Sequence, residues 1–123
     1  MEIKLIIAGS RDFSDYQLLQ IETQRFLVEN NFSPSKLTII SGGATGADSL
    51  GEDFARKYRF NLLIFLADWN KNGKAAGPIR NGEMAKVATH AIIFWDGESK
   101  GSKNMIDNSI KYNLIYKIVK YEN

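Results

Sequence analysis

Residues 37–48 read LTIISGGATGAD, and this stretch decides the fold class. Its first four residues are apolar or β-branched, which is typical of a buried strand. Three glycines follow within residues 42–46, and residues 46–58 then carry apolar side chains at helical spacing. A strand, a glycine-rich turn and a helix in this order are the unit from which parallel α/β sheets are built.

The same alternation of apolar runs and amphipathic segments recurs along the chain. Several of the apolar runs are continuous rather than alternating, as in parallel strands that helices cover on both faces. The pattern predicts a Rossmann-like open three-layer α/β sandwich with a mainly parallel five-stranded sheet, in one domain spanning residues 1–123. The predicted strands are Ile3–Ala8, Leu37–Ile40, Leu62–Leu66, Ala91–Trp95 and Leu114–Val119, and the predicted helices are Asp15–Asn30, Gly46–Tyr58, one from Pro78 onward and Ser102–Tyr112.

Local signals suggest how these helices begin. Ser14 and Gln17 have the spacing of a capping box, and Thr45 is placed to cap the second helix. Pro78 suits the first position of the third helix, which should turn Ile79 and Val87 inward. Residues 67–77 before it are expected to be irregular.

Composition excludes several kinds of chemistry. With no cysteine and a single histidine, His90, the chain offers no disulfide, thiolate nucleophile or histidine cluster, so we expect no metal and no cofactor. Sixteen Lys and Arg against fourteen Asp and Glu give a net charge of +2 without a concentrated basic face, so a nucleic acid partner is not expected. The sequence has no signal peptide pattern and no long apolar run, which predicts a cytoplasmic protein without a membrane partner.

Unusual polar residues follow the predicted strands directly. The carboxyl ends of parallel strands meet at one edge of a sheet, where ligands bind in open α/β folds. The predicted ligand-binding residues are Gly9, Ser10, Arg11 and Asp12; Ser41, Gly42, Gly43, Thr45, Gly46, Ala47 and Asp48; Asp68 and Trp69; Gly77, Pro78, Arg80 and Asn81; and Asp96 and Gly97.

The glycine-rich loop after the second strand suits a phosphate, because bare backbone N–H groups and a helix N-terminus converge there. It is not a triphosphate-hydrolysis loop, since Ala47 and Asp48 stand where that pattern has Lys and Ser or Thr. A tight turn that binds nothing is the alternative interpretation.

Arg80 is the second indication of an anionic ligand. A cation near a helix N-terminus is unfavourable with the helix dipole, so a shared anion would explain it. An ion pair with Glu83 or a loop carboxylate is the alternative for Arg80. Arg11 could likewise bind an anion or pair with Asp12, Asp15 or Asp48.

Three aspartates and a tryptophan could complete the site. Asp48, Asp68 and Asp96 could accept hydrogen bonds from ribose hydroxyls or act on a glycosidic bond, although Asp48 also fits an ordinary first-turn helix position. Trp69 could stack on a base.

Taken together, several segments resemble the SLOG superfamily, which includes the lonely-guy enzymes and DprA proteins. They are Ile7–Phe13, Ser41–Asp48, Ala67–Trp69, Ala76–Asn81 with Met84, and Phe94–Gly97 followed by Lys100–Ser102. The closest resemblance is to the small DUF2493 proteins, the YspA/YpsA-related SLOG family. It implies binding of a nucleotide or nucleotide-derived ligand, of ADP-ribose or cyclic-nucleotide type.

The chain departs from the catalytic segment of the lonely-guy enzymes, Pro-Gly-Gly-x-Gly-Thr-x-x-Glu. Ser41 replaces the proline, an extra residue separates Gly43 from Gly46, and Glu52 lies at a different offset from the glutamate. The resemblance therefore implies phosphate binding more than catalysis.

Two functions remain open on the sequence. One is a sensor or sequestering protein that binds the ligand without turnover. The other is a phosphoribohydrolase or related nucleotide N-glycosidase, with Asp48, Glu52 and Arg80 as candidate catalytic residues. A DNA-associated role like that of the DprA branch fits the near-neutral charge least well, and we expect a homodimer or larger homo-oligomer.

Overall fold

The computed structural model describes residues 1–122, which form a single five-stranded sheet in the order β3-β2-β1-β4-β5. Every neighbouring pair of strands is parallel, so the predicted fold class is confirmed and the sheet is wholly parallel. The strands are β1 (Ile3–Gly9), β2 (Leu37–Ser41), β3 (Asn61–Ile64), β4 (His90–Trp95) and β5 (Ile115–Lys120).

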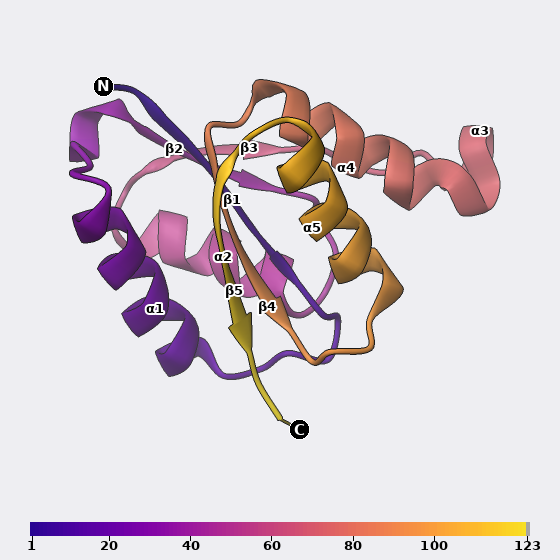
Figure 1. The fold of residues 1–123 in the computed structure, drawn as a ribbon, viewed down its shortest axis with the longest axis horizontal. Helices are drawn as coiled ribbons and strands as arrows, with labels where there is room; N and C mark the ends of the chain where they lie inside the picture. Colours follow the sequence, from indigo (N-terminus) through magenta and orange to yellow (C-terminus); the bar gives the residue numbers. More distant parts are fainter. Residues whose placement is uncertain (123) are drawn as a thin grey trace.

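Helices cover both faces of the sheet (Figure 1). One layer contains α1 (Tyr16–Glu29) and α2 (Ala47–Lys57), and the other contains α4 (Ala76–Val87) and α5 (Lys100–Lys111). The chain crosses from one layer to the other after β3, so the strand order reverses between β1 and β4. The crevice at such a switch point is where ligands bind in doubly wound sheets.

Two cores fill the space between the sheet and its helices. Leu5 and Ile7 of β1 face α1 and α2, whereas Ile6 faces α4 and α5, and all three side chains are fully buried. Burial on both faces explains why β1, β2 and β4 read as continuous apolar runs.

Two predicted helix caps are wrong. Asp15, not Ser14, caps α1, because its side chain accepts the N–H of Leu18. The N-cap of α2 is Gly46 with φ of +77°, and no side chain caps it, so Thr45 does not have this role.

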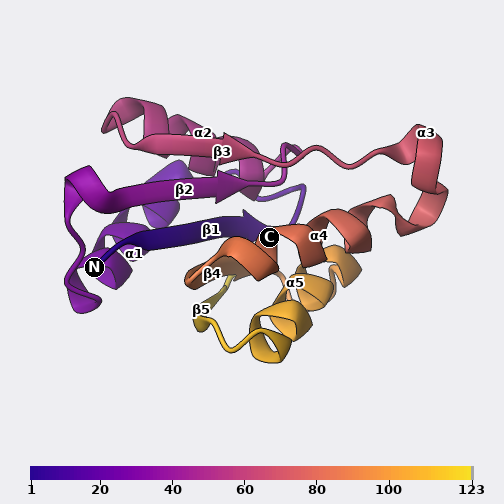
Figure 2. The same cartoon turned by 90° about the horizontal axis from the view of Figure 1, so that it is seen from above.

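The predicted irregular stretch is in fact largely helical. It contains the short helix α3 (Trp69–Asn72), a 3₁₀ turn (Gly73–Ala75) and the start of α4. Figure 2 shows α3 standing away from the sheet, on the side toward which the strands point. Among the described residues, no helix is long and apolar enough to cross a membrane.

The early start of α4 changes which residues it buries. Pro78 is its third residue rather than its first, and Ile79 and Val87 are exposed by 43% and 41%. Met84 and Ala85 face the core instead, and Ala76 and Gly77 are buried in the first turn of the helix.

Candidate functional site

A hollow of about 510 Å³ opens at the carboxyl ends of β1 and β4, within the range of small-molecule sites. We call it the main pocket. The loop after β1 and the first turns of α4 and α5 form most of its wall. The predicted residues that line it are Gly9, Ser10, Arg11, Asp12, Asp48, Trp69, Gly77, Pro78, Arg80, Asn81 and Asp96.

A second, shallower hollow of about 420 Å³ lies beside the glycine-rich loop, and we call it the side pocket. Gly42, Gly43 and Thr45 line it together with Leu66 and Ala67. The remaining predicted residues, Ser41, Gly46, Ala47, Asp68 and Gly97, line neither pocket.

Sequence reasoning missed the part of the main pocket that α5 supplies. Ser99, Lys100, Gly101, Ser102 and Asn104 all line it, because the N-terminus of this helix faces the hollow. The available signal was the segment Lys100–Ser102, which is among the segments that carry the family resemblance but was not included in the predicted site. Lys74 also lies on the wall of this pocket.

Arg80 is held in place from two sides. Its Nε donates to Asn81 Oδ1 at 3.0 Å, and its Nη1 donates to the carbonyl oxygen of Gly42. These bonds leave Nη2, which lies on the side of Gly77 in the pocket wall. Within residues 1–122 no ion pair joins Arg80 to Glu83. An ion pair with Glu83 therefore does not explain why an arginine stands at this position.

Asn81 links Arg80 to α5 by hydrogen bonds. Its side chain is buried, and its Nδ2 donates to Asn104 Oδ1 at 3.0 Å. Asn104 Oδ1 also accepts from Asn108 Nδ2 at 3.2 Å, which fixes the orientation of the Asn104 amide. A line of amides therefore ties the arginine to the neighbouring helix.

Asp48 is a buried acid beside this arginine. Its Oδ2 accepts the N–H of Ala44 at 3.2 Å, and the residue is only 6% exposed. Burial raises the pKa of Asp48 to about 6, although the Ala44 N–H and the positive charges of Arg80 and Arg11 act in the opposite direction. Its Oδ2 and Arg80 Nη1 would each lie 2.8 Å from a Cβ at position 42, which is why a glycine stands there.

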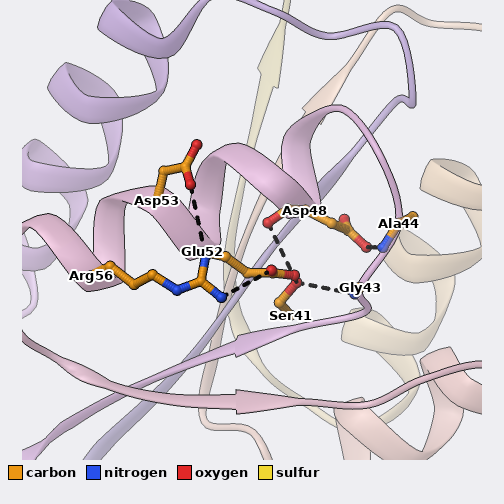
Figure 3. Close-up of polar contacts among 7 residues, drawn as sticks. All are labelled: Ser41, Gly43, Ala44, Asp48, Glu52, Asp53 and Arg56. Atoms are coloured by element: carbon orange, nitrogen blue, oxygen red, sulfur yellow. Dashed lines mark hydrogen bonds and ion pairs between the residues drawn. The ribbon is translucent and has the colours of Figure 1, made fainter.

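Glu52 lies behind the glycine-rich loop rather than in a pocket (Figure 3). Ser41 Oγ donates to Glu52 Oε2 at 2.6 Å and accepts the N–H of Gly43 at 3.1 Å. Arg56 pairs with the same carboxylate at 3.6 Å. The contacts of Glu52 are therefore those of a group that supports the loop.

Two other carboxylates of the predicted site, Asp68 and Asp96, accept hydrogen bonds from backbone N–H groups of their own turns. Asp96 Oδ1 accepts the N–H groups of Ser99 and Glu98, and these bonds lower the pKa of Asp96. Asp68 caps α3 by accepting the N–H of Lys71 at 3.0 Å.

Trp69 stands at the boundary of the two pockets. Its side chain lines both, is 50% exposed, and has the Arg11 guanidinium 5.8 Å from its ring centroid. Trp95 instead donates its indole N–H to the carbonyl oxygen of Ser99 and packs against the core, as expected for a structural residue. Within residues 1–122 no group of three or more His, Cys, Asp and Glu side chains is arranged to hold a metal ion.

Comparison with known proteins agrees with this architecture. The X-ray structure of DNA processing protein A (DprA) from Streptococcus pneumoniae superposes with a TM-score of 0.70 at 14% identity. The match covers 99% of this chain and 51% of that one, so the chain spans about half the length of DprA. The likeness supports the Rossmann-like fold.

Sequence comparison gives the family. The Gene 61 protein of Mycobacterium phage D29 is 32% identical over an alignment of 121 positions, which covers 90% of this chain and 91% of the relative. Residues 3–72 match the model of the YspA, cpYpsA-related SLOG family, and this stretch contains β1, the glycine-rich loop and α2. The chain therefore belongs to the YspA, cpYpsA-related SLOG family.

Proposed function

We propose that the protein binds a nucleotide or nucleotide-derived ligand in the main pocket, as a sensor or sequestering protein. The observation that carries this proposal is the fixed guanidinium of Arg80, whose Nε and Nη1 are engaged while Nη2 remains for a ligand. Guanidinium groups bind phosphate oxygens with strong, charge-assisted hydrogen bonds. Membership of the SLOG family supports a nucleotide-related function in general.

Other groups around the pocket suit an anionic ligand. Arg11 lies on the same wall as Arg80, and Lys74 and Lys100 add positive charge to the rim. The N-terminus of α5, at Ser99 to Ser102, also faces the hollow and favours negative charge through the helix dipole.

The rest of the pocket suits a nucleoside. Met84 and Met105 supply apolar surface, and the half-exposed Trp69 offers a ring on which a base can stack. Asp48 lies on the wall as a hydrogen-bond partner for ribose hydroxyls.

Isothermal titration calorimetry with AMP, ADP, ADP-ribose, NAD and cyclic dinucleotides tests the proposal. We expect binding of at least one of these ligands, and a loss of about 10- to 100-fold in affinity for Arg80→Lys, since charge-assisted hydrogen bonds contribute about 1.5–3 kcal/mol. Arg25→Lys is the matched control, because Arg25 is exposed on α1 and pairs with Glu22. Absence of heat with every ligand, or equal losses in both variants, would refute the proposal.

A nucleotide N-glycosidase is the second candidate, and the environment of Asp48 favours it. A buried carboxyl with a pKa of about 6 beside an arginine is suited to proton transfer near neutral pH. In this alternative Asp48 is the acid or base, and Arg80 binds the phosphate.

Chromatography of nucleoside monophosphates after long incubation at high protein concentration distinguishes the two candidates. Release of free base, with a loss of about 10²- to 10⁴-fold in Asp48→Asn, would support the enzyme. Binding without release of base would leave the sensor or sequestering role.

We also propose that the partner of this chain is a second copy of itself. Strand β5 forms one edge of the sheet, and its Ile115, Tyr116 and Ile118 are exposed by 54%, 38% and 39%. An edge strand with apolar side chains is a surface that pairs readily with another chain. A monomer in light scattering at micromolar concentration would contradict this proposal.

A further inference from the structure

The side pocket adjoins the main pocket along a common wall. Arg11, Ala44, Trp69 and Arg80 line both hollows. A phosphate held by the two arginines would therefore have open space on either side of it. A mononucleotide would use only one of these spaces.

The two spaces differ in charge. The main pocket carries Asp12, Asp48 and Asp96 together with its lysines. In the side pocket, the shared arginines are the only charged residues among the described lining residues. Its other polar side chain is Thr45, so this hollow suits an uncharged group with a few hydroxyls.

Leu66 gives the side pocket an apolar lip. Its side chain is 76% exposed, yet it reaches over the backbone of Gly43, where a Cβ would lie 2.6 Å from Leu66 Cδ2. Gly43 has φ of +71°, so the loop presents bare backbone beneath this side chain. Leu66 therefore packs directly on this backbone, and its exposed side is left for the ring of a sugar or base to lie against.

We infer that the side pocket is a binding site for the second arm of a two-armed ligand. The ligand class is two nucleosides, or a nucleoside and a sugar, joined by a central diphosphate. The diphosphate lies on Arg11 and Arg80, the first nucleoside lies in the main pocket, and the second, uncharged ring lies beside Leu66 and Thr45. This inference rests on the proposed function, because it takes the main pocket as a nucleotide site.

Calorimetry with AMP, ADP, ADP-ribose and NAD tests it. We expect ADP-ribose or NAD to bind at least about tenfold tighter than ADP, a difference of about 1.4 kcal/mol. ADP carries more negative charge than ADP-ribose, so attraction to the arginines alone predicts the opposite order. Equal or tighter binding of ADP would overturn the inference while leaving the proposed function in place.

Variants of the side pocket locate the second arm. Thr45→Phe fills the hollow and should remove the advantage of the two-armed ligand while changing the affinity for AMP less than about threefold. Ser35→Phe is the matched control, since Ser35 is exposed in the 3₁₀ turn (Pro34–Lys36) that precedes β2, at the opposite end of the sheet. Thermal unfolding of each variant checks that it is folded.

Leu66→Ser removes the apolar lip without adding bulk and should weaken only the two-armed ligand. If Thr45→Phe and Leu66→Ser leave the ratio of the ADP-ribose and ADP affinities unchanged, the inference is wrong. If none of the four ligands binds the unmodified protein, the proposed function fails and the inference fails with it.

Discussion

The hydroxyl of Ser41 donates to Glu52 Oε2 at 2.6 Å, and its oxygen accepts the N–H of Gly43 at 3.1 Å. Ser41 ends β2 and Glu52 lies in α2, so this pair joins the two elements on either side of the glycine-rich loop. Glu52, a candidate catalytic residue on the sequence, thus acts on the shape of the loop.

Glu52→Gln should keep ligand affinity within about threefold, because the glutamine oxygen can still accept from Ser41. Ser41→Ala should weaken binding more and lower the free energy of unfolding by about 1–3 kcal/mol, since the Gly43 N–H and the Glu52 carboxylate both lose a partner. Calorimetry and urea denaturation measure both effects. Loss of binding or of base release in Glu52→Gln alone would show that Glu52 acts directly on the ligand.

Asp48→Asn should make the free protein more stable above about pH 6. The pKa of Asp48 is raised in the folded state, so the native protein binds a proton more tightly than the unfolded chain, and stability falls as pH rises from about 4 to 6. Asparagine removes this cost, which amounts to about 2–3 kcal/mol at pH 7. Urea denaturation at several pH values should show a difference between the proteins that grows from pH 4 to 7.

Comparison with the unmodified protein is essential in that experiment. Burial lowers the pKa of His90, so its contribution to stability is lost as pH falls below about 6.5. This effect runs against that of Asp48 over part of the same range. Because both proteins contain His90, its contribution cancels in their difference, and a difference that does not change with pH would contradict the assigned role of Asp48.

Gly51→Ala and Gly82→Ala should change stability in opposite directions. A Cβ at position 51 would lie 2.7 Å from Ile7 Cγ2, so α2 must move away from the sheet at a cost of about 1–3 kcal/mol. A Cβ at position 82 would meet only Asn108 Oδ1 at 3.8 Å, so alanine there should stabilise α4 by about 0.5–1 kcal/mol. Thermal unfolding distinguishes the two, and equal effects would mean that α2 packs less closely on β1 than described.

Tyr121→Phe should loosen the first loop of the main pocket. The hydroxyl of Tyr121 donates to Asp12 Oδ1 at 2.8 Å, and its ring packs edge-on against Phe13 with centroids 4.7 Å apart. Phenylalanine keeps the ring contact and loses the hydrogen bond, which should cost about 0.5–1.5 kcal/mol of stability. Tyr121→Ala should cost more, and chemical denaturation that found the two variants equal would contradict a role for the ring.

Apolar patterning was sufficient to predict the sheet, because β1, β2 and β4 are buried on both faces and alternate with helices. The N-cap residue of α1 could not be predicted in this way. Ser14 and Asp15 are both good capping residues, and only the path of the chain selects Asp15. The short helix α3 was also missed, because Asn70, Lys71 and Asn72 give no apolar period to detect.

The candidate site was predicted as an edge of the sheet but not as two hollows. Strand ends and helix starts placed Arg11, Asp48 and Arg80 at this edge, and the structure brings the three residues together in the wall of the main pocket. What each side chain does depends on contacts across distant segments, such as those of Asn81 with Asn104. Nothing in the local sequence of Asn104 indicates that it lines a pocket.

The internal bonds of the glycine-rich loop have a consequence for the kinetics of recognition. Gly43 and Ala44 donate their N–H groups to Ser41 and Asp48, and the Gly42 carbonyl accepts from Arg80, so the loop is ordered when the chain folds. An arriving ligand therefore does not have to organise the wall that receives it, and most of the entropy lost on association is its own. In the proposed sensor role, the protein would respond to a brief rise in ligand concentration at a rate set mainly by encounter.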